Sequence, residues 1–203
     1  MFEQSDRLIL IGAGGHGKVV AETATILGYQ EIVFADSAWP DRIANGRWPI
    51  VMAQPTIDNP ATIFCSVGDN VIRERLFVSF PLHCSPSLLH PAATVSPSVR
   101  IGAGVFCQAG AVVNADAVIG KGVILNTGCS VDHDCRIGDF VHISPGAHLA
   151  GDVHVGSRTW IGIGASVRQG IRIGSDVVIG AGAAVVSDIA DHSRVGGVPA
   201  KSI

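Results

Sequence analysis

A strict six-residue repeat of aliphatic positions occupies the second half of the chain. Starting at Val95 and ending at Val185, every sixth residue is Val, Ile or Leu, with Cys107 as the one exception among sixteen positions. The residue two positions earlier is small or β-branched throughout. Residues two apart share one face of a β-strand, and no helical period produces two such columns. The pattern therefore predicts short strands whose small aliphatic side chains point inward.

A second period of eighteen residues lies on top of the first. Glycine follows the aliphatic position at Gly102, Gly120, Gly138, Gly156 and Gly174. Three six-residue units therefore form one coil, and these glycines stack at a corner where the turn leaves no room for a Cβ. The two periods together predict a three-sided prism of parallel strands over residues 91–190.

The first eighty residues have a different pattern. Buried-strand runs at 7–11, 31–35 and 62–66 alternate with helical stretches at 18–27 and 71–78. This order predicts a small α/β domain over residues 1–80, equivalent to half of a Rossmann-like fold. A proline-punctuated linker over 81–90 and a tail over 191–203 complete the predicted organisation.

A glycine-rich turn follows the first predicted strand. Gly12, Gly14 and Gly17 match G-x-G-x-x-G between a strand and a helix, and Asp36 ends the next strand. This arrangement is typical of NAD binding, but no second half of a dinucleotide fold follows. One pyrophosphate at the helix start, with Asp36 on a ribose or base, fits the shorter domain better. A turn without a ligand is the remaining alternative.

Composition excludes several classes of protein. The chain has 203 residues, of which 47% are hydrophobic and 15% charged, with a net charge of −3. It is therefore neither disordered nor a nucleic-acid binder. The longest apolar run, 177–186, is half the length of a membrane span, and the start lacks the basic region of a signal peptide. Five cysteines without close pairing favour the reducing cytoplasm.

The combination of motifs resembles a known family. The prism repeat is similar to the left-handed parallel β-helix of hexapeptide-repeat acyltransferases. With Gly-Ala-Gly-Gly-His-Gly at 12–17 and Ser-Val-Gly-Asp-Asn at 66–70 followed by Arg73, the whole chain resembles the N-acetyltransferases of nucleotide-linked 4-amino sugars and the related sialic acid O-acetyltransferases. The resemblance implies a homotrimer, a nucleotide-sugar in the first domain, and acetyl-CoA between neighbouring prisms.

The most polar stretch of the prism is the candidate catalytic segment. Transfer of an acyl group from a thioester to an amine needs a base for the ammonium proton, and His133 between Asp132 and Asp134 suits that task. The resemblance makes His133 the base and Asp134 the acid that raises its basicity, with Asp here in place of the family's Glu. Backbone N–H groups near Gly151 are expected to stabilise the oxyanion.

The resemblance also assigns binding residues. Those expected to contact acetyl-CoA are His142, Gly151, Ile163, Ala181 and Lys201, the last as a point charge near the phosphates. Those expected to contact the nucleotide-sugar are Gly14, Gly15, His16, Asp36, Ser37, Gly68 and Asn126. No metal is expected.

Four alternatives stay open from the sequence. The same base would serve O-acetylation of a sialic acid. The prism could be a trimeric scaffold without catalysis. A zinc-dependent carbonic anhydrase of this class needs three histidines around one ion, yet His142, His148 and His154 are six apart and predicted on three different faces. An inward cysteine could be a nucleophile, although a small buried hydrophobe is the simpler interpretation. The sequence does not identify the sugar and does not distinguish a UDP-linked from a GDP-linked substrate. It also assigns no role to Trp39 and Trp48.

Overall fold

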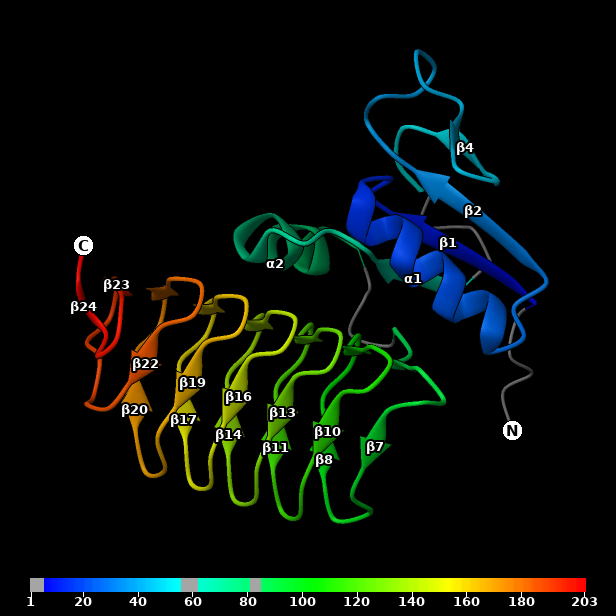
Figure 1. Cartoon of the computed structure of the whole chain (residues 1–203). Coiled ribbons are helices and arrows are strands. Elements are labelled where there is room, and N and C mark those ends of the chain that lie inside the picture. The colour runs from blue at the N-terminus through cyan, green and yellow to red at the C-terminus, as the bar shows by residue number, and fades with distance from the viewer. Residues whose placement is uncertain (1–5, 56–61, 81–84) are drawn as a thin grey trace.

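The structure is a computed structural model that describes residues 6–55, 62–80 and 85–203. A small α/β domain lies over one end of a three-sided prism, and one of its helices extends along the coils (Figure 1). Within the described residues no helix is long and apolar enough to cross a membrane.

The N-terminal domain is built on a five-stranded sheet. Its elements are β1 (Arg7–Ile11), α1 (Gly15–Ile26), β2 (Glu31–Ala35), β3 (Ala44–Asn45), β4 (Trp48–Met52), β5 (Thr62–Cys65) and α2 (Asn70–Ser79). The strand order is β3-β4-β2-β1-β5, and only β3 is antiparallel to its neighbour. The predicted strands and helices are present, and α1 begins three residues earlier than expected. The β3–β4 hairpin was not predicted.

The hairpin shows where one of the two tryptophans without an assigned role lies. Trp48 opens β4 and is buried in the domain core against Phe34 and Ile50. Trp39 is 41% exposed. The indole of Trp48 is therefore mainly a core side chain, whereas much of Trp39 is exposed.

Three parallel sheets form the prism. The sheet on which the N-terminal domain packs is called the docking face here, and the others are the second and third faces. The docking face contains β6 (Leu88–Leu89), β9 (Phe106–Cys107), β12 (Ile124–Leu125), β15 (His142–Ile143), β18 (Trp160–Ile161), β21 (Val178–Ile179), β23 (Arg194–Gly196) and β24 (Lys201–Ser202). The second face contains β7 (Thr94–Val95), β10 (Val112–Val113), β13 (Ser130–Val131), β16 (His148–Leu149), β19 (Ser166–Val167) and β22 (Ala184–Val185). The third face contains β8 (Arg100–Ile101), β11 (Val118–Ile119), β14 (Arg136–Ile137), β17 (His154–Val155) and β20 (Arg172–Ile173).

Strand register confirms the eighteen-residue coil. Val112 pairs with Ser130, and Ile124 pairs with His142, each one coil along. The inward columns are buried, including Cys107, Cys129 and Cys135, which are at most 1% exposed. Burial raises the pKa of these thiols to about 11, 12 and 11 respectively. They are therefore core side chains, as expected, and not nucleophiles.

The prism is longer at both ends than the sequence pattern indicated. Strand β6 lies in the segment assigned to the linker and already pairs with β9; residues 81–84 of that segment lie outside the described residues. At the other end, β23 pairs with β21, β24 folds back on β23, and Val195 is buried. The tail therefore forms the last part of the docking face. The six-residue repeat did not predict this, because the spacing of aliphatic residues is irregular there.

Both helices attach the N-terminal domain to the prism. Leu88, Phe106 and Ile124 of the docking face share one core with α1, and Thr23 Oγ1 donates to Gln108 Oε1 at 3.0 Å. Helix α2 packs Phe77 edge-to-face on Phe140, with ring centroids 5.4 Å apart. The N-terminal domain is thus fixed at one end of the docking face.

Candidate active site

The glycine-rich turn presents a helix start toward open space. The first N–H groups of a helix have no intrahelical acceptor, and Gly14, which caps α1, supplies no side-chain acceptor for them. A Cβ at Gly14 or Gly15 would meet nothing within 4 Å, whereas one at Gly17 would collide with the Gly12 carbonyl. Gly17 therefore permits close packing of helix and turn, and the other two border the site. This geometry suits an anion such as a pyrophosphate.

The other expected nucleotide residues meet at the same edge of the sheet. Asp36 and Ser37 follow β2, and Gly68 follows β5, the two strands that flank β1. Asp36 Oδ2 accepts from the Ala13 N–H at 2.6 Å, so the carboxylate shapes the turn itself. Carboxyl ends of parallel strands at such a point are the usual ligand position in α/β sheets.

Two residues that the sequence analysis missed support the turn, one in the loop after β2 and one in β3. Arg42 Nη1 donates to the Ala13 carbonyl at 2.9 Å, and Asn45 Nδ2 donates to the Gly14 carbonyl at 3.0 Å. Arg42 Nη2 also donates to Asn45 Oδ1 at 2.9 Å. Because both contacts join residues about thirty positions apart, no local pattern could reveal them.

An apolar groove of about 460 Å³ runs along the docking face. Its lining includes four of the expected residues, Asn126, His142, Ile163 and Ala181. Lys201 on β24 lies farther along the same sheet. Trp160, which the sequence analysis did not single out, also lines the groove: its indole stacks on His142 at 4.9 Å and donates from Nε1 to Ser144 Oγ at 2.8 Å.

Two histidines at the domain junction are held neutral. His16 lies edge-to-face on Phe106 at 5.3 Å, and its ring centroid is 6.3 Å from that of His142. Burial, followed by the positive charge of Arg73, lowers the pKa of His16 to about 4. Burial, Arg73 and His16 lower the pKa of His142 to about 3. At neutral pH both rings therefore act as uncharged hydrogen-bonding groups and not as bases.

His133 has the opposite environment. It lies at the corner between β13 and β14, and 60% of its side chain is exposed. Its Nδ1 is 2.8 Å from Asp134 Oδ2, and this hydrogen bond is the main cause that raises the pKa of His133. Because a carboxylate only accepts, Nδ1 carries the proton and Nε2 of the neutral ring keeps a free lone pair. His133 thus has an exposed nitrogen without a proton, and the Asp134 side chain is long enough to reach the ring.

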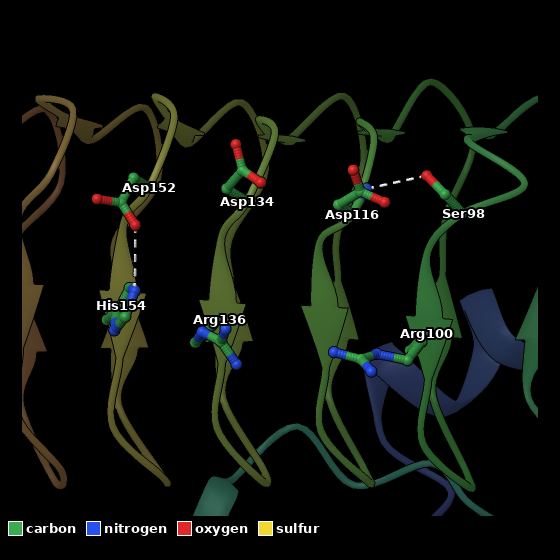
Figure 2. A pocket seen from close by; sticks show the side chains of 7 residues that line it. All are labelled: Ser98, Arg100, Asp116, Asp134, Arg136, Asp152 and His154. Atoms are coloured by element: carbon green, nitrogen blue, oxygen red, sulfur yellow. Dashed lines mark hydrogen bonds and ion pairs between the residues drawn. The ribbon is translucent and has the colours of Figure 1, made fainter.

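The backbone explains how Asp134 reaches the ring. Asp134 has a φ of +61°, a left-handed conformation that Asp tolerates better than most residues. Asp116 and Asp152 occupy the same turn position one coil away on either side, with φ of +61° and +57°. Figure 2 shows these carboxylates in a row above Arg136 and His154, in a polar pocket of about 850 Å³. Of the three turns, only the one at Asp134 carries a histidine in the preceding position.

Gly151 lies directly against the His133 ring. A Cβ at Gly151 would be 2.5 Å from His133 Cε1. Its φ is not left-handed, so the imidazole and not the backbone requires glycine here. No described residue accepts a hydrogen bond from the Gly151 N–H, so this donor is available next to the His133 ring.

The predicted residues form two groups that one chain does not bring together. The groove, His16 and the glycine-rich turn lie on or above the docking face. His133, Asp134 and Gly151, called the histidine corner here, lie where the second and third faces meet, which is the corner opposite the docking face. A reaction that uses both groups needs a second copy of the chain.

The three evenly spaced histidines do not converge. His142, His148 and His154 lie on the docking, second and third faces respectively. Across the described ranges, no group of three or more His, Cys, Asp or Glu side chains is arranged to hold a metal ion.

Comparison with known proteins agrees with these two parts of the chain. Residues 7–80 match the PglD N-terminal domain, and residues 116–151 and 152–186 match the bacterial transferase hexapeptide (six repeats). The fold is therefore that of the left-handed β-helix acyltransferases with a small α/β domain in front.

Solved structures give a more specific assignment. The acetyltransferase domain of PglB from Neisseria gonorrhoeae is 44% identical, with 98% of this chain and 100% of that chain covered and a TM-score of 0.91. The same domain has been solved in complex with acetyl coenzyme A, with a TM-score of 0.89. PerB from Caulobacter crescentus, in complex with CoA and GDP-perosamine, is 40% identical over 97% of this chain and 96% of that chain, with a TM-score of 0.87. The chain belongs to this family of hexapeptide-repeat acetyltransferases, which confirms the resemblance inferred from the sequence.

Proposed function

We propose that this acyltransferase transfers the acetyl group of acetyl-CoA to the 4-amino group of a nucleoside-diphosphate-linked 4-amino-deoxy sugar. The amine nitrogen attacks the thioester carbon, the C–S bond breaks, and CoA leaves as its thiolate. The proton lost by the amine passes to Nε2 of His133. The transfer is direct, without an acyl-enzyme, and the burial of Cys107, Cys129 and Cys135 is consistent with this.

The observation that carries the proposal is the pairing of His133 with Asp134. A base with its pKa raised and its free nitrogen directed outward can take a proton from an ammonium group formed beside it. The glycine-rich turn supports a pyrophosphate-bearing acceptor, and PerB, 40% identical, is seen with GDP-perosamine. A free sialic acid carries no pyrophosphate, so the N-terminal site favours N-acetylation of a nucleotide-sugar.

The two groups of residues meet between subunits of a homotrimer in this proposal. Asn126, His133 and His142 lie within one eighteen-residue coil. Adjacent coils are about 4.8 Å apart, the spacing of neighbouring strands. A rotational symmetry axis parallel to the prism relates the subunits without shifting them along that axis, so equivalent residues of neighbouring subunits lie at the same height. The histidine corner of one subunit therefore faces the groove of its neighbour at the level of Asn126 and His142, with the pantetheine arm running toward Ile163, Ala181 and Lys201. We place this enzyme in the cytoplasm.

The test is CoA release from acetyl-CoA with a panel of UDP- and GDP-linked 4-amino sugars, together with their 4-hydroxy counterparts. Release with at least one amino sugar and none of its hydroxyl counterparts supports the proposal. Absence of release with the whole panel contradicts it. Binding of UDP or GDP measured by calorimetry separates this function from acetylation of a sugar without a nucleotide.

A further inference from the structure

Arg73 is the largest fully buried side chain in the described residues, at 1% exposure, and the mechanism above does not use it. Its guanidinium forms no ion pair within the described ranges; the acceptors that it contacts are all neutral. Burial is the main cause that lowers its pKa to about 10, so it stays charged at neutral pH. A buried cation without a carboxylate in contact is unfavourable in itself, so its hydrogen bonds must offset this cost.

Those hydrogen bonds connect two coils of the prism to the nucleotide edge. Nε donates to the Gly122 carbonyl at 2.7 Å, and Nη2 donates to the Phe140 carbonyl at 2.8 Å. Nη1 donates to the carbonyls of Val67 and Gly68 at 3.1 and 2.9 Å. One planar group thus links the loop after β5 to fixed points on the prism. Lysine cannot reproduce this fork, because its donors radiate from one nitrogen.

The anchored loop lies next to both histidines of the domain junction. A Cβ at Gly68 would be 3.9 Å from the Cβ of His16, and the Gly68 carbonyl acts on the His142 ring to raise its pKa against the larger effect of burial. The Asn126 amide is oriented by the Thr127 N–H, which donates to its Oδ1 at 2.8 Å. Asn126 Nδ2 therefore donates to His142 Nε2, 3.1 Å away, and the neutral ring carries its proton on Nδ1.

We propose that Arg73 is a positioning residue for acetyl transfer, because its fork sets the Gly68 edge of the nucleotide-sugar site at a fixed place above the His142 end of the groove. The inference rests on the proposed function. In this inference Arg73 aligns the nucleotide-sugar with acetyl-CoA, in addition to attaching α2 to the prism. The expected defect is therefore in turnover and in nucleotide-sugar binding, with acetyl-CoA binding retained, because the groove residues belong to the prism alone.

The experiment compares Arg73→Lys with Glu74→Gln, its neighbour on the same helix. Glu74 also links α2 to the prism, through Arg158 Nη1 at 3.2 Å, but it does not contact the loop after β5. We expect Arg73→Lys to lower kcat about 10²-fold, the effect of misplacing a reactant by about 1 Å. The KM for the nucleotide-sugar rises as well, while the KM for acetyl-CoA stays within about twofold. Glu74→Gln changes none of these constants more than about twofold.

Amide hydrogen exchange provides a readout that does not depend on activity. Arg73→Lys should speed exchange of the segment 66–70 and leave the prism coils unchanged. Wild-type kinetics and exchange in Arg73→Lys overturn the proposal, and so does an equal loss in Glu74→Gln. Arg73→Gln is the second variant; if neither variant folds, Arg73 is a residue of global stability and the proposal is wrong. If the wild-type enzyme releases no CoA with any nucleotide-sugar, the proposed function fails, and the exchange comparison alone then decides the role of Arg73.

Discussion

The groove on the docking face and the histidine corner use the same residue type in opposite ways. In the groove, His142 is 6% exposed, stacked on Trp160, and its pKa is lowered to about 3. At the corner, His133 is solvent-exposed and bonded to a carboxylate that raises its pKa. The difference matches the division of tasks in the proposed function, in which the uncharged groove binds and orients acetyl-CoA and His133 at the corner accepts the proton.

The same division is the reason why the proposed function uses more than one chain. A narrow prism has no interior to hold a pocket, because its core is filled by the two inward columns. Its surfaces are shallow, and a deep site forms only where two surfaces meet. The proposed function places binding and proton transfer on opposite sides of the prism, and in that proposal each copy is incomplete alone.

The largest expected effect is removal of the base. His133→Ala should lower kcat by about 10²–10⁴-fold, the usual contribution of a positioned base. Steady-state kinetics should show KM values for both substrates little changed, because binding belongs to the docking face. Light scattering should show an unchanged assembly, since His133 lies outside the inward columns. Turnover near the wild-type rate would remove the corner from the mechanism.

The next effect concerns the surface that supports the base. Gly151→Ala places a methyl group against the His133 ring and should lower kcat about 10²-fold by displacing it. The same substitution in a His133→Ala background should cost almost nothing further, because the ring that it displaces is absent. Additive losses in the double variant would mean that Gly151 acts independently of His133.

A smaller effect tests the charge at the corner. Asp134→Asn keeps the left-handed turn and should lower kcat/KM about tenfold. Asp134 raises the pKa of His133. Since the neutral ring is the base, activity is lost as pH falls through that pKa, and removal of the charge moves the acidic limb to lower pH.

Asp152→Asn is the matched control for this shift. Asp152 has the same turn position one coil along, and it is the last of the causes that raise the pKa of His133. A pH–rate profile should therefore show a smaller shift for Asp152→Asn than for Asp134→Asn. Equal shifts would indicate a general field effect of the acidic row and not a specific pair.

The smallest effect concerns the far end of the groove. Lys201 is exposed, so Lys201→Ala should raise the KM for acetyl-CoA only about two- to fivefold, the size of a surface ion pair. The increase should vanish at high salt. Lys121→Ala, a lysine paired with Asp139, should leave this KM unchanged. A salt-independent increase for Lys201→Ala would mean that it contributes packing and not charge.

The repeat was predictable because each inward position depends only on its place in the coil. His133 and Asp134 were predictable for a related reason: their hydrogen bond joins adjacent residues. The stack of Trp160 on His142 and the fork of Arg73 were not, because they join residues 18 and up to 67 positions apart. Strand β4 was also missed, because it contains Pro49, which disfavours a strand, and its antiparallel partner β3 has only two residues.

The most direct measurement of the central claim is complementation between two inactive variants. His133→Ala removes the base, and Ala181→Trp fills the groove from an exposed position on the docking face. If each site takes its base from one subunit and its groove from the next, co-assembled trimers contain about one intact site in four on random mixing. Activity on the order of a quarter of the wild-type value is therefore predicted for the mixture. Mixed assemblies no more active than the separate variants would contradict a site shared between chains.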